Sequence, residues 1–260
     1  MTNIPHAYRE MTISSAQMEV PRESYQPNFN VNPAKKIADE FDERIANEPK
    51  GSFRDGRYFV FDGQHTVAAR KFLNGGEDLP IKCKVYFDMT EQEEALLFAQ
   101  QTGASAPLSA GAKLRAEIHG EDPFALAFKA ATESVGLQLD YDQERGEMRI
   151  GCIQTARNAY STIGEDRYKE AMQILATVWN GDPDSFRAEN VVAITRFVDL
   201  YHEEYNPKRL IDQLRKVDPL AFYRAGHATG LALAGYKKYL YQVWQLYNGG
   251  SKKYALPLKF

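Results

Sequence analysis

The residues with the clearest chemical potential lie in one short run, Val60 to Thr66, where a hydrophobic stretch stops at Asp-Gly and polar side chains follow. Gly63 lets the backbone turn sharply and approach a ligand closely. At the start of a helix, the N–H groups of Gln64, His65 and Thr66 have no intrahelical acceptor. These groups and the positive end of the helix dipole favour a phosphate or a similar anion.

The same junction has a purely structural interpretation. Strand–Asp-Gly–helix connections join elements in many proteins, and Asp62 or Thr66 would then only cap the helix. A histidine at a helix start is also more often structural than catalytic. In the functional interpretation, His65 and Asp62 are the candidate catalytic residues. Arg70, one turn beyond Thr66 on the same helix face, is then a supporting cation.

Hydrophobic periodicity and turn residues predict the elements that position this run. We expect residues 1–106 to form a compact α+β domain with a small mixed sheet and helices. The predicted strands are residues 11–20, 52–53, 57–61 and 81–87, and the predicted helices are residues 33–46, 65–73 and a segment capped by Thr90.

The pattern changes after Pro107, and helical spacing dominates from there to the end of the chain. We expect residues 107–260 to form a mostly helical domain, interrupted by one β-hairpin near residues 137–151. The predicted helices are residues 109–119, 122–135, 152–162, 165–180, 187–204, 207–216 and 229–247.

Composition excludes several classes of protein. Charged residues make up 26% of the 260 residues and hydrophobic residues 43%, as in ordinary globular proteins. Two separated cysteines, Cys83 and Cys152, exclude a disulfide framework and a zinc ribbon, and no metal site is predicted. No apolar run is long enough for a signal peptide core or a membrane span. We therefore expect a cytoplasmic protein without a membrane partner.

The formal charge of −3 hides an asymmetry along the chain. From Asn206 onward, ten Lys and Arg face two acids, so this part is basic and the remainder acidic. Aromatic residues interleave with the basic ones, a combination that suits phosphates and unpaired bases. The candidate nucleic-acid patch is Lys237, Lys238, Lys252 and Lys253. The alternatives are a solvated basic face and, for Leu240, Val243, Trp244 and Tyr247 at helical spacing, a hydrophobic core.

Four segments, in this order, resemble the ParB/sulfiredoxin-like superfamily. The central one resembles the family's core motif, in which a strand runs into G-x-x-R or DG-x-H-R and then an alanine-rich helix. The others resemble its QPR segment, its V-P-V strand and the helix that leads to its E-N-x-Q-R motif. The segments are residues 23–27 (ESYQP), 63–71 (GQHTVAARK), 78–85 (DLPIKCKV) and 96–109 (LLFAQQTGASAPLS).

The resemblance implies a ParB/sulfiredoxin-like fold for the first domain and a phosphate or nucleotide at the turn. The nucleotide-binding set carried over is Gly63, Gln64, His65, Thr66, Arg70, Gln101 and Thr102. Thr66 replaces the motif arginine, and the segment around Gln101 lacks the acid and the arginine of the E-N-x-Q-R motif. The chain is thus similar to an atypical, DGQHR-type member, in which binding is favoured over catalysis.

The resemblance also implies a phage, plasmid or other mobile-element protein that associates with DNA. The expected ligand is CTP, ATP or ADP, with Mg²⁺ as an open question. Homodimer formation stays open. The first alternative is a ParB-like enzyme, a nuclease, NTPase or nucleotide-dependent kinase, acting at the DGQHT turn. The second is a non-catalytic interaction protein.

Overall fold

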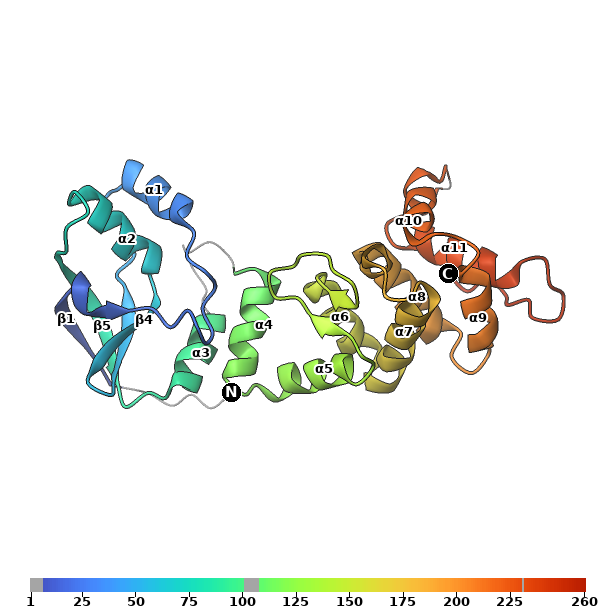
Figure 1. Cartoon of the computed structure of the whole chain (residues 1–260), viewed down its shortest axis with the longest axis horizontal. Helices are drawn as coiled ribbons and strands as arrows, with labels where there is room; N and C mark the ends of the chain where they lie inside the picture. Colours follow the sequence, from blue (N-terminus) through green and yellow to red (C-terminus); the bar gives the residue numbers. More distant parts are fainter. Residues whose placement is uncertain (1–6, 101–107, 231) are drawn as a thin grey trace. The chain divides into compact units, whose positions relative to one another are not determined.

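The structure is a computed structural model that describes residues 7–100, 108–230 and 232–260. It divides into two compact units, Met1–Pro123 and Phe124–Phe260. The predicted boundary after residue 106 lies outside the described residues. Because α4 (Ala110–His119) packs against α3 (Glu91–Ala99), the helix that follows this point belongs to the first unit (Figure 1).

The first unit is built on a five-stranded mixed sheet with the order β1-β5-β3-β4-β2. β1 runs antiparallel to β5, β3 runs parallel to β5 and antiparallel to β4, and β2 runs parallel to β4. The α+β class and the small mixed sheet are therefore confirmed. The strands are β1 (Tyr8–Ser14), β2 (Met18–Glu19), β3 (Lys50–Arg54), β4 (Arg57–Asp62) and β5 (Pro80–Phe87).

The prediction of one strand over residues 11–20 is wrong, because a short 3-10 helix, Ser15–Gln17, separates β1 from β2. The Ser14 side chain caps this turn by accepting a hydrogen bond from the Ala16 N–H. The two strands lie at opposite edges of the sheet, although only three residues join them. A flat five-stranded sheet spans roughly 19 Å, beyond the reach of that link, so the sheet is curled. Ile13 and Met18 accordingly pack in one cluster with Cys83 and Val85.

Helices cover both faces of the sheet (Figure 1). α2 (Gln64–Leu73) contributes Val67 to the cluster around Cys83 and packs against α1 (Val31–Asp39). α3 contributes Phe98 to a second cluster around Tyr25. The predicted helix over residues 33–46 starts and ends earlier, since Asn30 caps it and the chain leaves the helix at Glu40. Ile45 is left exposed.

The second unit is mostly helical, as predicted. One predicted helix, residues 229–247, is wrong at its start, and residues 219–228 form a separate helix behind the Asp218 cap and Pro219. The helices are α5 (Pro123–Glu133), α6 (Ile153–Ile163), α7 (Glu165–Val178), η2 (Pro183–Phe186), α8 (Ala188–Leu200), α9 (Pro207–Leu214), α10 (Pro219–Ala228) and α11 (Lys237–Asn248). Among the described residues, no helix combines the length and apolar character that crossing a bilayer requires.

The predicted hairpin near residues 137–151 is also wrong. β6 (Gln138–Leu139) and β7 (Arg149–Ile150) pair in parallel, so the chain between them loops back before it pairs. That loop is anchored from outside, because the Met148 N–H donates to the Gly181 carbonyl oxygen. A tight turn around Arg145–Gly146 would have required antiparallel strands.

The core of the second unit lies between α6, α7, α8 and α11. Leu240, Val243 and Tyr247 are buried there, as their helical spacing predicted. The C-terminal tail folds back along α11, where Trp244 Nε1 and Asn248 Nδ2 donate to the Leu256 carbonyl oxygen. Trp179, the other tryptophan of the chain, donates to the Val217 carbonyl oxygen in the same unit.

Candidate anion-binding site

The turn after β4 has the predicted strand–turn–helix geometry. β4 ends at Asp62, Gly63 adopts a left-handed conformation with φ of 88°, and α2 begins at Gln64. The first helical hydrogen bond runs from the Val67 N–H to the Gly63 carbonyl oxygen, at 3.0 Å. No side chain caps the helix. The N–H groups of the first turn are therefore available to a ligand.

Gly63 is required for a second reason that the sequence did not reveal. A Cβ at this position would lie 2.9 Å from the Cα of Pro49. Real Cβ atoms do not approach a backbone atom that closely, and the positive φ is itself unfavourable for other residues. Glycine thus sets the packing of the turn on the neighbouring strand, in addition to any approach of a ligand.

Two side chains at the start of α2 have unsatisfied hydrogen-bonding capacity. Gln64 Oε1 and His65 Nε2 are buried, and neither has a hydrogen-bond partner within the described part of the chain. Thr66, the third residue of this turn, is only 6% exposed. Buried polar groups are normally paired, so this concentration at one helix start fits a ligand better than a simple connection.

The surroundings of His65 bring in a cation that the sequence analysis missed. The His65 ring stacks on Phe29 at 5.3 Å between centroids, and the Arg22 guanidinium lies 5.1 Å from the Phe29 ring centroid. Burial lowers the pKa of His65, a backbone hydrogen bond with Asn30 raises it, and the charge of Arg22 lowers it further. His65 is therefore neutral near pH 7, next to an exposed arginine.

Two of the predicted residues have other partners. Asp62 forms an ion pair with Lys50 at 2.8 Å, which occupies one of its oxygens and places a lysine beside the turn. Arg70 pairs with Glu43 at 2.8 Å and lies over the ring of Phe41. The Glu43 carboxylate therefore partly neutralises the charge that Arg70 could offer to a bound anion. Two further members of the predicted set, Gln101 and Thr102, lie outside the described residues.

A buried polar cluster on the opposite face of the sheet was missed by the sequence analysis. The Glu94 carboxylate is fully buried and accepts hydrogen bonds from Tyr25 Oη at 3.1 Å and Arg54 Nε at 2.8 Å. Ser52 Oγ donates to it as well. Burial and the neighbouring Glu94 charge raise the pKa of Tyr25. Since every group in the cluster is paired, we assign it a structural role, joining α3 to β3 and the segment before α1.

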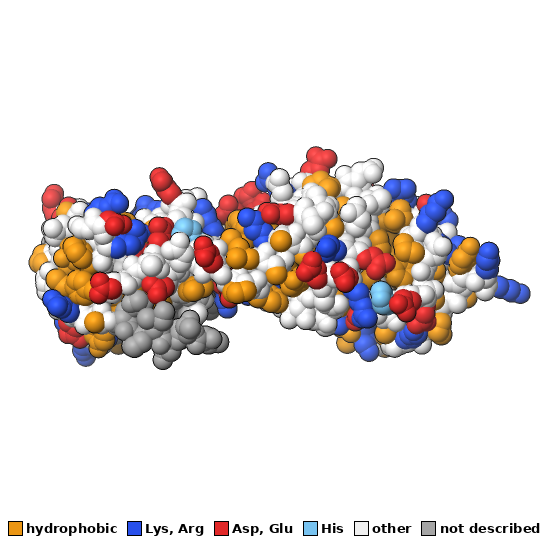
Figure 2. All heavy atoms as spheres, turned by 90° about the horizontal axis from the view of Figure 1, so that it is seen from below, with side chains coloured by type: hydrophobic (Ala, Val, Ile, Leu, Met, Phe, Trp, Pro, Cys, Tyr) orange, Lys and Arg blue, Asp and Glu red, His pale blue; other side chains and the backbone are white. Residues whose placement is uncertain are grey.

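The predicted nucleic-acid patch is divided in the structure. Lys237 and Lys238 lie at the first turn of α11, whereas Lys252 and Lys253 follow its last turn. A twelve-residue helix separates the two pairs by roughly 18 Å. On the face seen in Figure 2, basic and acidic side chains are interspersed. The four lysines therefore do not form one continuous patch.

Metal and thiol chemistry find little support in the described part of the chain, where no group of three His, Cys, Asp or Glu side chains is placed to hold a metal ion. Burial raises the pKa of Cys83 to about 11 and that of Cys152 to about 12. Both thiols are thus protonated at neutral pH and poorly nucleophilic.

The comparison with protein families gives one result. A family model described as a family of unknown function, DUF6551, matches residues 20–260. The match includes both units almost entirely, so the chain belongs to this family. Neither the curated proteins nor the solved structures yielded a match.

Proposed function

We propose that this protein is a ParB-like, DNA-associated protein whose first unit binds the phosphate groups of a nucleotide at the start of α2. The observation that carries the proposal is the uncapped first turn of α2, where His65 Nε2 is buried without a partner among the described residues. The order of the ParB-like segments along the chain adds to it and suggests an origin in a phage, a plasmid or another mobile element.

The chemistry of the turn fits a phosphate group. Backbone N–H groups and the Thr66 hydroxyl donate to its oxygens, and the helix dipole favours its charge. Arg22 takes the place of the motif arginine that Thr66 replaces, since it lies close enough to His65 to lower that residue's pKa. Lys50, paired with Asp62, is a second cation near the same turn.

His65 gives the proposal a distinctive property. A phosphate close to the ring favours the charged imidazolium, which donates from both nitrogens. Binding therefore takes up a proton when it starts from the neutral histidine. Affinity rises as the pH falls through the pKa of the free His65, which lies below the ordinary value of 6.5.

The test is isothermal titration calorimetry with CTP, ATP and ADP, with and without Mg²⁺. We expect Arg22→Gln to weaken binding by about tenfold or more, as expected for the loss of a charged hydrogen bond. Arg44→Gln is the matched control, because Arg44 is exposed and pairs only locally with Asp42. Titrations in two buffers of different ionisation enthalpy measure the proton uptake, which His65→Asn should abolish. If no nucleotide binds to the wild type, the proposal fails.

The enzyme alternative is favoured by one observation, the neutral His65 with an unpartnered Nε2. Such a group is suited to act as a general base. A ParB-like kinase, NTPase or nuclease would turn over nucleotide or DNA, and His65→Ala would abolish that turnover. Binding without turnover supports the primary proposal, and the absence of both supports an interaction protein.

A further inference from the structure

Two adjoining pockets lie on the second unit, at the first turn of α8. One pocket, of about 420 Å³, is enclosed by the starts of α8 and α11 and the end of α10. The other, of about 350 Å³, lies between the loop after β6, η2 and α8. Ala188 and Glu189 line both, so the two pockets form one groove. Each volume is in the range of ordinary ligand sites.

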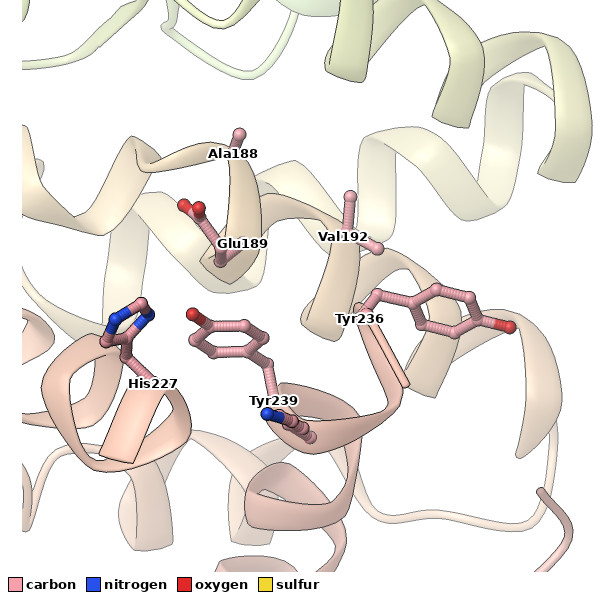
Figure 3. Close-up of a pocket in the computed structure, with 8 residues that line it drawn as sticks. Ala188, Glu189, Val192, His227, Tyr236 and Tyr239 are labelled. Atoms are coloured by element: carbon pink, nitrogen blue, oxygen red, sulfur yellow. The ribbon is translucent and has the colours of Figure 1, made fainter. Parts of the chain in front are cut away.

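The larger pocket is aromatic. Tyr236, just before α11, Tyr239 on α11 and His227 on α10 line it, and Lys238 adds a positive charge (Figure 3). Tyr239 stacks almost parallel on Tyr223, with an angle of 14° between the ring planes, and Tyr223 stacks on His227. Tyr236 remains 40% exposed. Tyr239 is only 7% exposed, so the Tyr236 ring is the one that can stack on an unpaired base.

The smaller pocket brings three arginines together with two acids, Glu144 and Glu189. Arg145, Arg149 and Arg187 line it, and each has an ion pair through a single nitrogen: Arg187 Nε and Arg145 Nη1 with Asp184, and Arg149 Nη1 with Asp140. A guanidinium carries five N–H donors, so each arginine keeps donors for another acceptor. The uncapped start of α8 adds N–H groups of its own.

Glu189 is the feature that selects among ligands. It lines both pockets and so lies where they meet, and Figure 3 shows its carboxylate directed away from the rings of His227 and Tyr239. A carboxylate there repels a phosphate but accepts hydrogen bonds from an amino group, as a base such as cytosine provides. The groove thus offers a base the exposed ring of Tyr236 and the carboxylate of Glu189, and it offers phosphates Lys238 and the spare donors of the three arginines.

We propose that this groove binds single-stranded nucleic acid, with an unpaired, amino-bearing base in the aromatic pocket and the backbone along the arginines. Duplex DNA does not fit, because its bases present no free face to stack on. The site lies within the second unit and shares no residue with the turn at α2. The two proposals can therefore fail independently.

The test is fluorescence anisotropy of the full chain with labelled single strands of 20 identical nucleotides at low salt, one of deoxycytidine (dC20) and one of deoxythymidine (dT20). We expect dC20 to bind more tightly than dT20 by about tenfold, and a duplex of the same length to bind more weakly than either. RNA oligonucleotides in a parallel series identify the sugar preferred. Tyr236→Ala should weaken dC20 binding by about tenfold. Arg149→Gln should make the affinity for dC20 less dependent on salt, by the amount expected for the loss of about one phosphate contact.

Matched controls distinguish the groove from a general attraction to charge. Tyr254→Ala changes an equally exposed tyrosine in the C-terminal tail, and Lys169→Gln removes a surface cation on α7. Both should bind like the wild type. Glu189→Ala should strengthen dT20 binding and reduce the preference for dC20 to near unity. Equal losses in Tyr254→Ala and Tyr236→Ala, tighter binding of the duplex, or no binding of either oligonucleotide would overturn the proposal.

Discussion

Replacing Gly63 by alanine tests the packing of the turn at α2 directly. The left-handed backbone costs a non-glycine residue roughly 1–2 kcal/mol. The new Cβ would also meet Pro49, at 2.9 Å from its Cα and 3.2 Å from its Cβ. Overpacking against atoms that cannot move away costs roughly another 1–3 kcal/mol. We therefore expect Gly63→Ala to lower the free energy of unfolding of the first unit by about 2–5 kcal/mol.

Gly56→Ala is the matched control for this substitution. Gly56 also has a positive φ, 74°, but nothing lies within 4 Å of the position of its Cβ. It should incur only the backbone cost, roughly 1–2 kcal/mol, so the difference between the two variants isolates the contact with Pro49.

The assay has to report on the first unit alone. Both tryptophans, Trp179 and Trp244, lie in the second unit, so tryptophan fluorescence does not follow unfolding of the sheet. Amide hydrogen exchange, measured on peptides from β4 and β5, does follow it. Equal losses in Gly63→Ala and Gly56→Ala would refute the packing argument. Because of this expected loss, substitutions of Gly63 are unsuitable for testing ligand binding at the turn.

Three further predictions concern buried polar groups. Glu94→Ala should destabilise the first unit by about 3–5 kcal/mol, because it leaves the buried hydroxyl groups of Tyr25 and Ser52 without an acceptor and removes the Nε partner of Arg54. Glu94→Gln combined with Arg54→Met should recover part of that loss in urea denaturation followed by hydrogen exchange. Because burial lowers the pKa of His65, the unfolded chain binds more protons below pH 6.5, so stability should fall between pH 7 and pH 5, and less steeply in His65→Asn. An unchanged pH profile in that variant would contradict the assignment. With a pKa of about 12, the Cys152 thiol should resist iodoacetamide at pH 8 in the folded protein and react in 8 M urea, as mass spectrometry of the labelled peptides would show.

Local chemistry explains which elements could be predicted from the sequence. Asp55 and Gly56 both adopt positive φ values, 52° and 74°, as a two-residue hairpin turn requires. Thr90 and Glu93 form the predicted capping box at α3. In each case neighbouring residues determine the conformation, so the signal is present in a few letters of sequence.

The errors have the opposite origin, since they depend on residues far apart in the chain. The break between β1 and β2 follows from their positions at opposite edges of the sheet, where they pair with β5 and β4, and no local pattern encodes that pairing. Glu94 looks like any solvated acid in the first turn of a helix, and its partner Arg54 is forty residues away. The missed helix at Pro219 is an exception, because its N-cap residue Asp218 and the proline at its first position are both recognisable in the sequence.

Likewise, the sequence identified only part of the candidate anion site. The Asp-Gly turn and the alanine-rich segment after it predicted the backbone geometry at Gly63. The contribution of Arg22 did not, since it depends on the stacking of His65 on Phe29, more than thirty residues earlier in the chain. Because Arg22 is positioned next to His65 by the ring of Phe29, no fixed sequence spacing links Arg22 to the turn.

The pairing of β1 with β5 has a consequence for biosynthesis. Tyr8 lies opposite Tyr86 in the sheet, so the first strand to leave the ribosome has no partner until the last strand has emerged. Contacts between residues so distant in sequence form late and slowly. During that interval, the nascent chain exposes an unpaired strand edge that carries Ile13, which is buried in the finished sheet. The first unit is therefore most exposed to chaperones, and to aggregation, before residue 87 has left the ribosome.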